Sequence, residues 1–271
     1  MIKGRAPYPF ETIAHAVSFS PALPALIAEM GRLCVLHNSL AIFIHVGKKT
    51  AEKHRELALH LSNNGFHDGN SRIYWEQGEV VANVLRICKY EVVDLLLAGV
   101  SERADLGLPA GSIARQLAKK AKCSVLILSG LPAGRFTKIV VNGKENKKTG
   151  LTIRTATYLA NVEKLSEVVV AGELKLSQEN AGDYMTISSL SESVSSADSM
   201  APVIVRTVSP ESENFKSLSD YAFQIQADLL VTYSSDHPFL IFDRLSDSNG
   251  IDELLNRMPS SLLIVHSRIS G

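Results

Sequence analysis

Residues 94–99 read DLLLAG, and a related segment, DLLVTY, follows at residues 228–233. A second pair of segments repeats in the same way, with CSVLIL at 123–128 and SSLLIV at 260–265. The first pair is 134 residues apart (94 to 228) and the second 137 (123 to 260). Near-constant spacing of this kind indicates that one structural unit has been duplicated.

These segments are part of a longer series of short apolar runs that alternate with amphipathic stretches. Such a series is typical of strands in a parallel sheet buried on both faces, with helices between the strands. Strands are expected at 13–18, 40–46, 71–75, 93–98 and 123–128 in the first half, and at 138–142, 167–171, 203–207, 228–232 and 260–265 in the second. The sequence therefore predicts an α/β protein with two tandem, doubly wound, five-stranded parallel sheets flanked by helices.

The helices of the first half are expected at 20–36, 50–61 and 79–89 and after residue 111. Ser20 followed by Pro21 predicts an N-cap and first helical position for the first of them. The third helix has a predicted apolar face made of Val80, Val84, Leu85 and Cys88. Residues 177–199 are rich in Ser, Glu, Asp and Asn, which predicts a loop or a poorly formed helix.

The boundary between the halves is expected near Gly130, Pro132 and Gly134, because Gly and Pro punctuate the chain there. The 271 residues are enough for two domains that each bury a core. We expect the first domain at 1–131 and the second at 136–271.

Composition excludes several classes of protein. Lys plus Arg equals Asp plus Glu, at 28 each, so no overall field attracts nucleic acid or anionic lipid. The three cysteines, Cys34, Cys88 and Cys123, lack CxxC spacing and lie in apolar surroundings, so we interpret them as reduced core residues. The longest apolar run, 92–100, contains Asp94 and is too short for a membrane span. We expect a soluble, cytoplasmic protein without nucleic-acid or membrane partners.

Motifs for metal binding and catalysis are missing from the sequence. His54, His60 and His67 are six and seven residues apart and form no i, i+4 pair for a metal on a helix. No GxSxG elbow occurs, and the stretch GVSERADLGLPAGS at 99–112 lacks the Gly-Lys of a P-loop. We predict no metal site and no catalytic residue, with weak ATP hydrolysis as the most that the chain performs.

The candidate ligand site is the stretch AGVSERADLGLPAGSI at 98–113. In a doubly wound sheet, ligands bind outside the carboxyl ends of the strands, where a helix N-terminus offers free N–H groups. Gly111 permits close backbone approach and Ser112 offers a hydroxyl, as in a phosphate cradle. The same two residues also fit a plain turn and helix N-cap, so both interpretations stay open.

The segments IAHAVSFSP, LAIFIHV, DLLLAG, GSIARQL and CSVLIL, in this order and spacing, resemble the universal stress protein domain. The resemblance covers about residues 10–130, and a looser copy over 138–268 is similar to the tandem members of that family. It implies an adenine nucleotide alpha hydrolase-like fold and a bound AMP or ATP in the first domain, with Mg²⁺ only if ATP binds. The resemblance implies a pocket lined by Ala16, Ser18, Val46, Gly99, Gly111 and Ser112.

This chain departs from the family pattern at several places. Nucleotide-binding members have a Gly, two residues, a Gly, nine residues and then Gly-Ser or Gly-Thr; here Glu102 stands in place of the second Gly and eight residues precede Gly111. Ser18 stands where the family commonly has Asp. In the second half, Lys144 takes that Asp position, Tyr233 replaces the first Gly and Asn249-Gly250 replaces Gly-Ser, so no phosphate loop is recognisable there.

Two functions therefore stay open. The protein is either a stress-response sensor that binds an adenine nucleotide in its first domain, or a scaffold for protein partners, unidentified so far, whose phosphate loops have degenerated. The path of residues 100–110 discriminates between them, because a loop folded over Gly99 would fill the pocket. The family resemblance also implies association through the last strands, 123–128 and 260–265, as an intramolecular pseudo-dimer or in a further homodimer.

Overall fold

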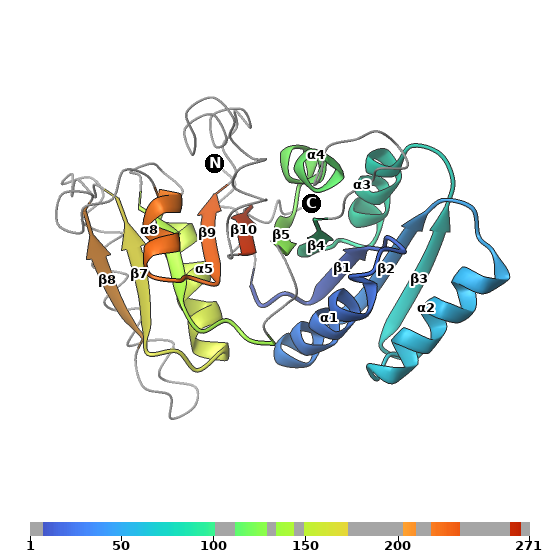
Figure 1. Cartoon of the computed structure of the whole chain (residues 1–271), viewed down its shortest axis with the longest axis horizontal. Helices are drawn as coiled ribbons and strands as arrows, with labels where there is room; N and C mark the ends of the chain where they lie inside the picture. The colour runs from blue at the N-terminus through green and yellow to red at the C-terminus, as the bar shows by residue number, and fades with distance from the viewer. Residues whose placement is uncertain are drawn as a thin grey trace. The chain divides into compact units, whose positions relative to one another are not determined.

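The computed structural model describes residues 8–100, 112–128, 134–143, 149–172, 203–209, 218–233 and 261–266. They divide into two compact units (Figure 1). Unit 1 comprises the described residues up to Gly134 together with His266, and unit 2 those from Arg135 to Val265. The domain limits 1–131 and 136–271 stay a prediction. No helix in the described part of the chain is long and apolar enough to cross a membrane.

Unit 1 is a parallel sheet with the strand order β3-β2-β1-β4-β5. Its elements are β1 (Thr12–Ala16), α1 (Leu23–His37), β2 (Leu40–Val46), α2 (Ala51–Asn63), β3 (Ser71–Glu76), α3 (Val80–Tyr90), β4 (Leu95–Gly99), α4 (Ser112–Lys120) and β5 (Ser124–Leu128). Helix α1 packs against α2, and α3 packs against α4. The order reverses between β1 and β4, which makes this the switch point where ligands bind in such sheets.

Unit 2 repeats this topology. Its elements are β6 (Ile139–Asn142), α5 (Thr149–Val162), β7 (Glu167–Ala171), β8 (Ile204–Val208), α8 (Leu218–Gln224), β9 (Leu229–Tyr233) and β10 (Ser261–Val265). Its strand order is β8-β7-β6-β9-β10, so the third, second, first, fourth and fifth strands follow one another as in unit 1. The pairs are again parallel. The predicted α/β fold class and all ten predicted strands are confirmed.

The first helix of unit 1 begins later than the sequence predicts. Helix α1 starts at Leu23, with Ala22 as a cap that makes no side-chain bond, and the carbonyl of Ser20 accepts the N–H of Leu23 at 2.9 Å in a preceding turn. Ser20 is therefore not the N-cap. Pro24 lies in the first turn of the helix, which is the position predicted for Pro21. Proline is tolerated there because a residue of the first turn donates no N–H within the helix. The helix packs its apolar side chains inward, since Leu23, Leu26, Ile27, Met30 and Leu33 are all buried.

Helix α3 also turns a different face inward from the predicted one. Its buried residues are Val81, Val84, Ile87 and Cys88, whereas Val80 and Leu85 are only half-buried. The carboxylate of Glu79 accepts the N–H groups of Val81 and Ala82, which makes Glu79 the N-cap. Apolar residues occur on several faces of this helix, so the sequence alone does not show which face is buried. Contact with the sheet buries one of these faces.

The duplication is visible in the backbone. Four of the described helices end in a non-glycine residue with positive φ: Asn38 (53°), Val92 (51°), Lys164 (59°) and Gln226 (54°). After each, an N–H bonds back to the carbonyl five residues earlier, as in Ser39 to Cys34 at 2.9 Å and Leu165 to Ala160 at 2.7 Å. This is the Schellman arrangement. Equivalent helices in the two units therefore share the same end.

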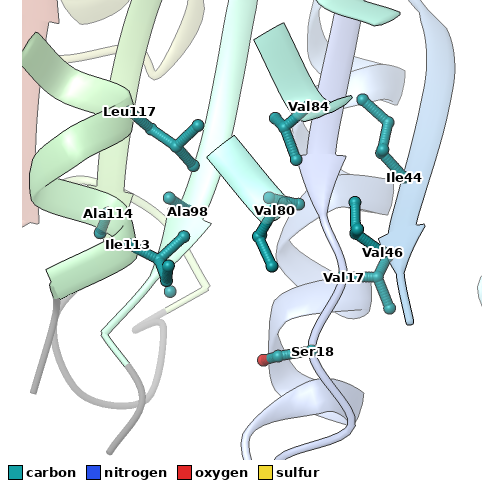
Figure 2. A pocket seen from close by; sticks show the side chains of 12 residues that line it. Val17, Ser18, Ile44, Val46, Val80, Val84, Ala98, Ile113, Ala114 and Leu117 are labelled. Carbon is teal, nitrogen blue, oxygen red and sulfur yellow. The ribbon is translucent and has the colours of Figure 1, made fainter. Parts of the chain in front are cut away.

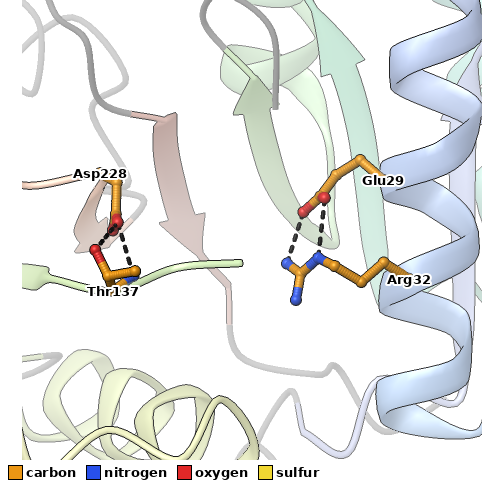
Figure 3. A network of polar contacts seen from close by, with 4 residues as sticks. All are labelled: Glu29, Arg32, Thr137 and Asp228. Atoms are coloured by element: carbon orange, nitrogen blue, oxygen red, sulfur yellow. Dashed lines mark hydrogen bonds and ion pairs between the residues drawn. The ribbon is translucent and has the colours of Figure 1, made fainter. Parts of the chain in front are cut away.

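The aspartate of the repeated DLL segment has the same structural role in both units. Asp94 Oδ2 accepts the N–H of Thr12 at 3.0 Å, just at the start of β1. Asp228 Oδ2 accepts the N–H of Thr137 at 2.7 Å and its hydroxyl at 2.6 Å, just before β6 (Figure 3). Each carboxylate ties the first strand of its sheet to the fourth. The repeat of the aspartate therefore reflects the architecture and not a ligand.

A buried carboxylate on α1 is neutralised within its own helix. Glu29, which is buried, receives two bonds from the guanidinium of Arg32, with Nε 2.9 Å from Oε2 and Nη2 2.6 Å from Oε1 (Figure 3). This two-pronged geometry offsets the cost of burying the charge. The pair belongs to the packing of α1 and does not take part in the site described next.

Candidate functional site

A pocket lies at the switch point of unit 1, where the carboxyl ends of β1, β2 and β4 meet α3 and the start of α4 (Figure 2). Its lining is Ala16, Val17, Ser18, Ile44, Val46, Val80, Val84, Ala98, Gly99, Ile113, Ala114 and Leu117. Only Ser18 in this lining has a polar side chain. The cavity measures about 40 Å³, whereas small-molecule sites usually have about 300–1,000 Å³.

The structure brings together four of the six residues named from the sequence. Ala16, Ser18, Val46 and Gly99 all line the pocket. Ser112 is the first residue of α4, next to the lining residue Ile113, and its Oγ is buried without a hydrogen-bond partner among the described residues. Gly111, Glu102 and the loop 101–110 lie outside the described residues.

The pocket residues that the helices contribute were not predicted from the sequence. Val80 and Val84 reach the pocket from α3, and Ala114 and Leu117 from α4. Helical periodicity marks such residues as apolar but does not tell which neighbour they face. Their convergence with strand ends from elsewhere in the chain depends on the tertiary fold.

Gly99 packs closely against α1. A Cβ atom on residue 99 would lie 2.6 Å from Cδ1 of Leu26, closer than any carbon contact allows. Leu26 is itself buried. The Cβ direction of residue 99 is therefore occupied by an apolar side chain of α1, and Leu26 is not one of the residues that line the pocket.

The polar groups around Ser18 are held by the protein itself. Ser18 Oγ donates to Ser20 Oγ over 3.4 Å, a long bond. Behind the pocket, His45 Nδ1 lies 3.1 Å from the carbonyl oxygen of Val17 and fixes the turn after β1. His15, in the centre of β1, is completely buried, and burial lowers its pKa to about 4, so it is neutral at physiological pH.

Within the described ranges, no cluster of His, Cys, Asp and Glu has the geometry to hold a metal ion.

Unit 2 differs at the equivalent strand ends. The registers of β1 with β4 and of β6 with β9 make Asn142 the counterpart of Ala16 and Thr232 that of Ala98. Asn142 Nδ2 donates to Thr232 Oγ1 at 3.2 Å, so a polar link between the strands takes the place of two small apolar walls. Tyr233 follows at the position of Gly99. Lys144 and Asn249-Gly250 lie outside the described residues.

Comparison with known proteins gives matches among solved structures. No protein-family model and no curated protein matches the chain. A protein of unknown function from Pseudomonas aeruginosa superposes with a TM-score of 0.63 at 14% identity, covering 97% of this chain and 94% of that one. A putative universal stress protein from the same species gives 0.61 at 13% identity, covering 97% and 95% of the two chains. A universal stress protein from Archaeoglobus fulgidus gives 0.63 at 11% identity, covering 96% and 100%. Over nearly its whole length, therefore, the chain has the fold of the tandem universal stress proteins.

Proposed function

We propose that unit 1 binds an adenine nucleotide, AMP or ATP, in its switch-point pocket, and that the protein acts in the cytoplasm as a stress-response sensor. One observation carries this proposal: Ala16, Ser18, Val46 and Gly99, from three separate strand ends, surround one cavity. The universal stress protein fold supports an adenine nucleotide as the ligand class. Binding would change the affinity of the protein for its partners.

The chemistry of the lining suits binding better than catalysis. Apolar walls from Val46, Val80 and Ile113 would contact the base and ribose, and the Ser18 hydroxyl would hydrogen-bond the nucleoside. The buried Ser112 hydroxyl and the N-terminus of α4 would face the phosphates together with Gly111. The described lining holds no titratable group that could act as a general base, so we expect slow ATP hydrolysis at most, with Mg²⁺ bound only alongside ATP.

A second candidate, a scaffold without nucleotide, is favoured by the size of the cavity. A space of about 40 Å³ accommodates a water molecule or two, and Leu26 lies against Gly99. Nucleotide binding therefore requires the pocket to widen, which costs binding free energy. For unit 2 we propose the scaffold role, because the Asn142–Thr232 bond and Tyr233 stand where unit 1 has small residues.

Calorimetric titration of the full chain with ATP and AMP, with and without Mg²⁺, tests the proposal. We expect micromolar binding at one site per chain, and nucleotide carried through purification in mass spectra. Val46→Trp should abolish binding by filling the cavity, whereas Ile204→Trp, on an exposed position of β8, should leave it unchanged. If no heat of binding and no carried nucleotide are found, the sensor function is contradicted and the scaffold function remains.

A further inference from the structure

The turn after β2 and the first turns of α2 carry a group of basic side chains in unit 1. This basic face consists of Lys48, Lys49, Lys53, His54 and Arg55. All are exposed except Lys53, which is half-buried. A shallow hollow of about 350 Å³, largely open to solvent, lies among them and is lined by Lys49, Thr50, Ala51, His54 and Arg55. Helix α2 lies beside β3, the outermost strand of the sheet of unit 1 (Figure 1).

The charges of the basic face are not neutralised by the described part of unit 1. The ion pairs described in that unit join Arg32 to Glu29, Arg72 to Glu91 and Arg86 to Glu76, and none involves the basic face. Within residues 48–55, the single carboxylate of Glu52 stands against the charges of three lysines and one arginine. A chain with no net charge therefore concentrates positive charge on one surface.

Aromatic rings beneath the basic face hold its two central lysines in position. Lys49 Nζ lies 5.5 Å from the ring centre of Trp75, and Lys53 Nζ lies 5.2 Å from that of Phe19. The two rings stack with centres 6.1 Å apart and planes at 21°. Contacts of this kind restrain flexible ammonium groups without neutralising them, so less entropy is lost when a partner pairs with them.

The same rings indicate which class of partner fits. Nucleic acid is commonly bound by cations next to aromatic faces on which bases stack. Here Trp75 is already in contact with Phe19, His45, His54 and Lys49. Among the described residues, both rings beneath the basic face therefore already contact other side chains, while its ammonium and guanidinium groups make no described ion pair.

We propose that the basic face is a docking surface for an acidic protein segment, rich in Asp and Glu. The carboxylates of the segment pair with Lys49, Lys53 and Arg55, and its backbone lies along the hollow at the start of α2. Docking of this kind is governed by electrostatic complementarity and weakens as salt rises. It does not depend on nucleotide binding in the switch-point pocket.

Fluorescence anisotropy of a labelled deca-glutamate peptide with the full-length protein tests this proposal. We expect binding that weakens with added NaCl, and a loss of affinity of about tenfold or more in Lys49→Gln/Lys53→Gln/Arg55→Gln. The matched control, Lys89→Gln/Lys120→Gln/Lys122→Gln, removes the same charge from exposed positions elsewhere in unit 1 and should change affinity less than about twofold. Circular dichroism establishes that both variants fold.

Three results would overturn the docking surface. Equal losses in the two triple variants would mean that only net charge matters. Tighter binding of an oligothymidine than of deca-glutamate would make the surface a nucleic-acid site. Failure of the wild-type protein to bind the peptide at low salt would remove the proposal altogether, whatever the titration with ATP and AMP shows.

Discussion

At Val92 a β-branched residue occupies the left-handed backbone that ends α3, with φ at 51°. This conformation costs an L-residue about 1–2 kcal/mol, and β-branching adds to the crowding. The side chain is 68% exposed, so replacing it removes little buried surface. We expect Val92→Asn to raise the free energy of unfolding by about 1 kcal/mol. Urea unfolding measures this change.

The equivalent position in unit 2 provides the control for this substitution. Lys164 has the same backbone conformation without β-branching, so Lys164→Asn should stabilise less. An unchanged or lower midpoint for Val92→Asn would show that backbone strain at residue 92 does not limit the stability of unit 1.

The three cysteines differ in accessibility, which corrects the interpretation of all of them as core residues. Cys34 and Cys88 are buried, but Cys123 is half-buried. Burial raises the pKa of Cys34 to about 12, and a hydrogen bond with Cys123, together with burial, raises the pKa of Cys88 well above its usual range. Because the thiolate is the reactive form, iodoacetamide at about pH 8 should modify Cys123 first. Peptide mass spectrometry that finds Cys34 or Cys88 labelled as fast would contradict this order.

At the scale of elements, the contact between α1 and the end of β4 can be tested with a double-mutant cycle. Gly99→Ala places a methyl group against Leu26 and should destabilise unit 1 by about 1–3 kcal/mol through overpacking. In a Leu26→Ala background the obstructing atoms are gone, so the same substitution should cost much less. Trp75, the single tryptophan of the chain, reports the unfolding of unit 1 by fluorescence.

The cycle also separates the two roles of Gly99. A large coupling energy means that packing against α1 explains the glycine without a phosphate. Equal costs of Gly99→Ala in both backgrounds would mean that Leu26 does not restrict residue 99, and the nucleotide interpretation of the glycine would gain weight.

At the scale of the whole molecule, the units should respond differently to acid. Burial is the main cause that lowers the pKa of both His15 and His37 in unit 1 to about 4, against 6.5 for a free side chain, whereas the described residues of unit 2 include no histidine. The folded state therefore binds fewer protons than the unfolded state, and stability falls as pH drops from about 6.5 to about 4. We expect the protection factors of backbone amides in hydrogen exchange at pH 5 to fall in unit 1 before unit 2.

Position 141 in unit 2 supplies the variant for this test. The strand registers make Val141 on β6 the counterpart of His15 on β1. His15→Val therefore introduces the residue that unit 2 already has at the equivalent position. Its unfolding free energy should depend less on pH than that of the wild type. An unchanged pH dependence in the variant would show that another group governs the acid response. The association of the units through 123–128 and 260–265 stays a prediction.

The fold class, the duplication and the positions of the ten strands could all be predicted from the amino-acid sequence. Apolar runs such as 40–46 are long enough to specify buried strands locally, and the spacing of the DLL segments records a repeat of backbone structure. The family resemblance also named four residues that line the pocket at the ends of β1, β2 and β4.

Three features of unit 1 could not be predicted from the sequence. The face that α3 buries, the start of α1 at Leu23 and the contact of Leu26 with Gly99 depend on which surfaces pack together. The basic face emerges in the same way, because Phe19 and Trp75 are far apart in the sequence but stack in space beneath Lys49 and Lys53. Periodicity records which residues avoid water, whereas the choice of neighbour is a property of the folded chain.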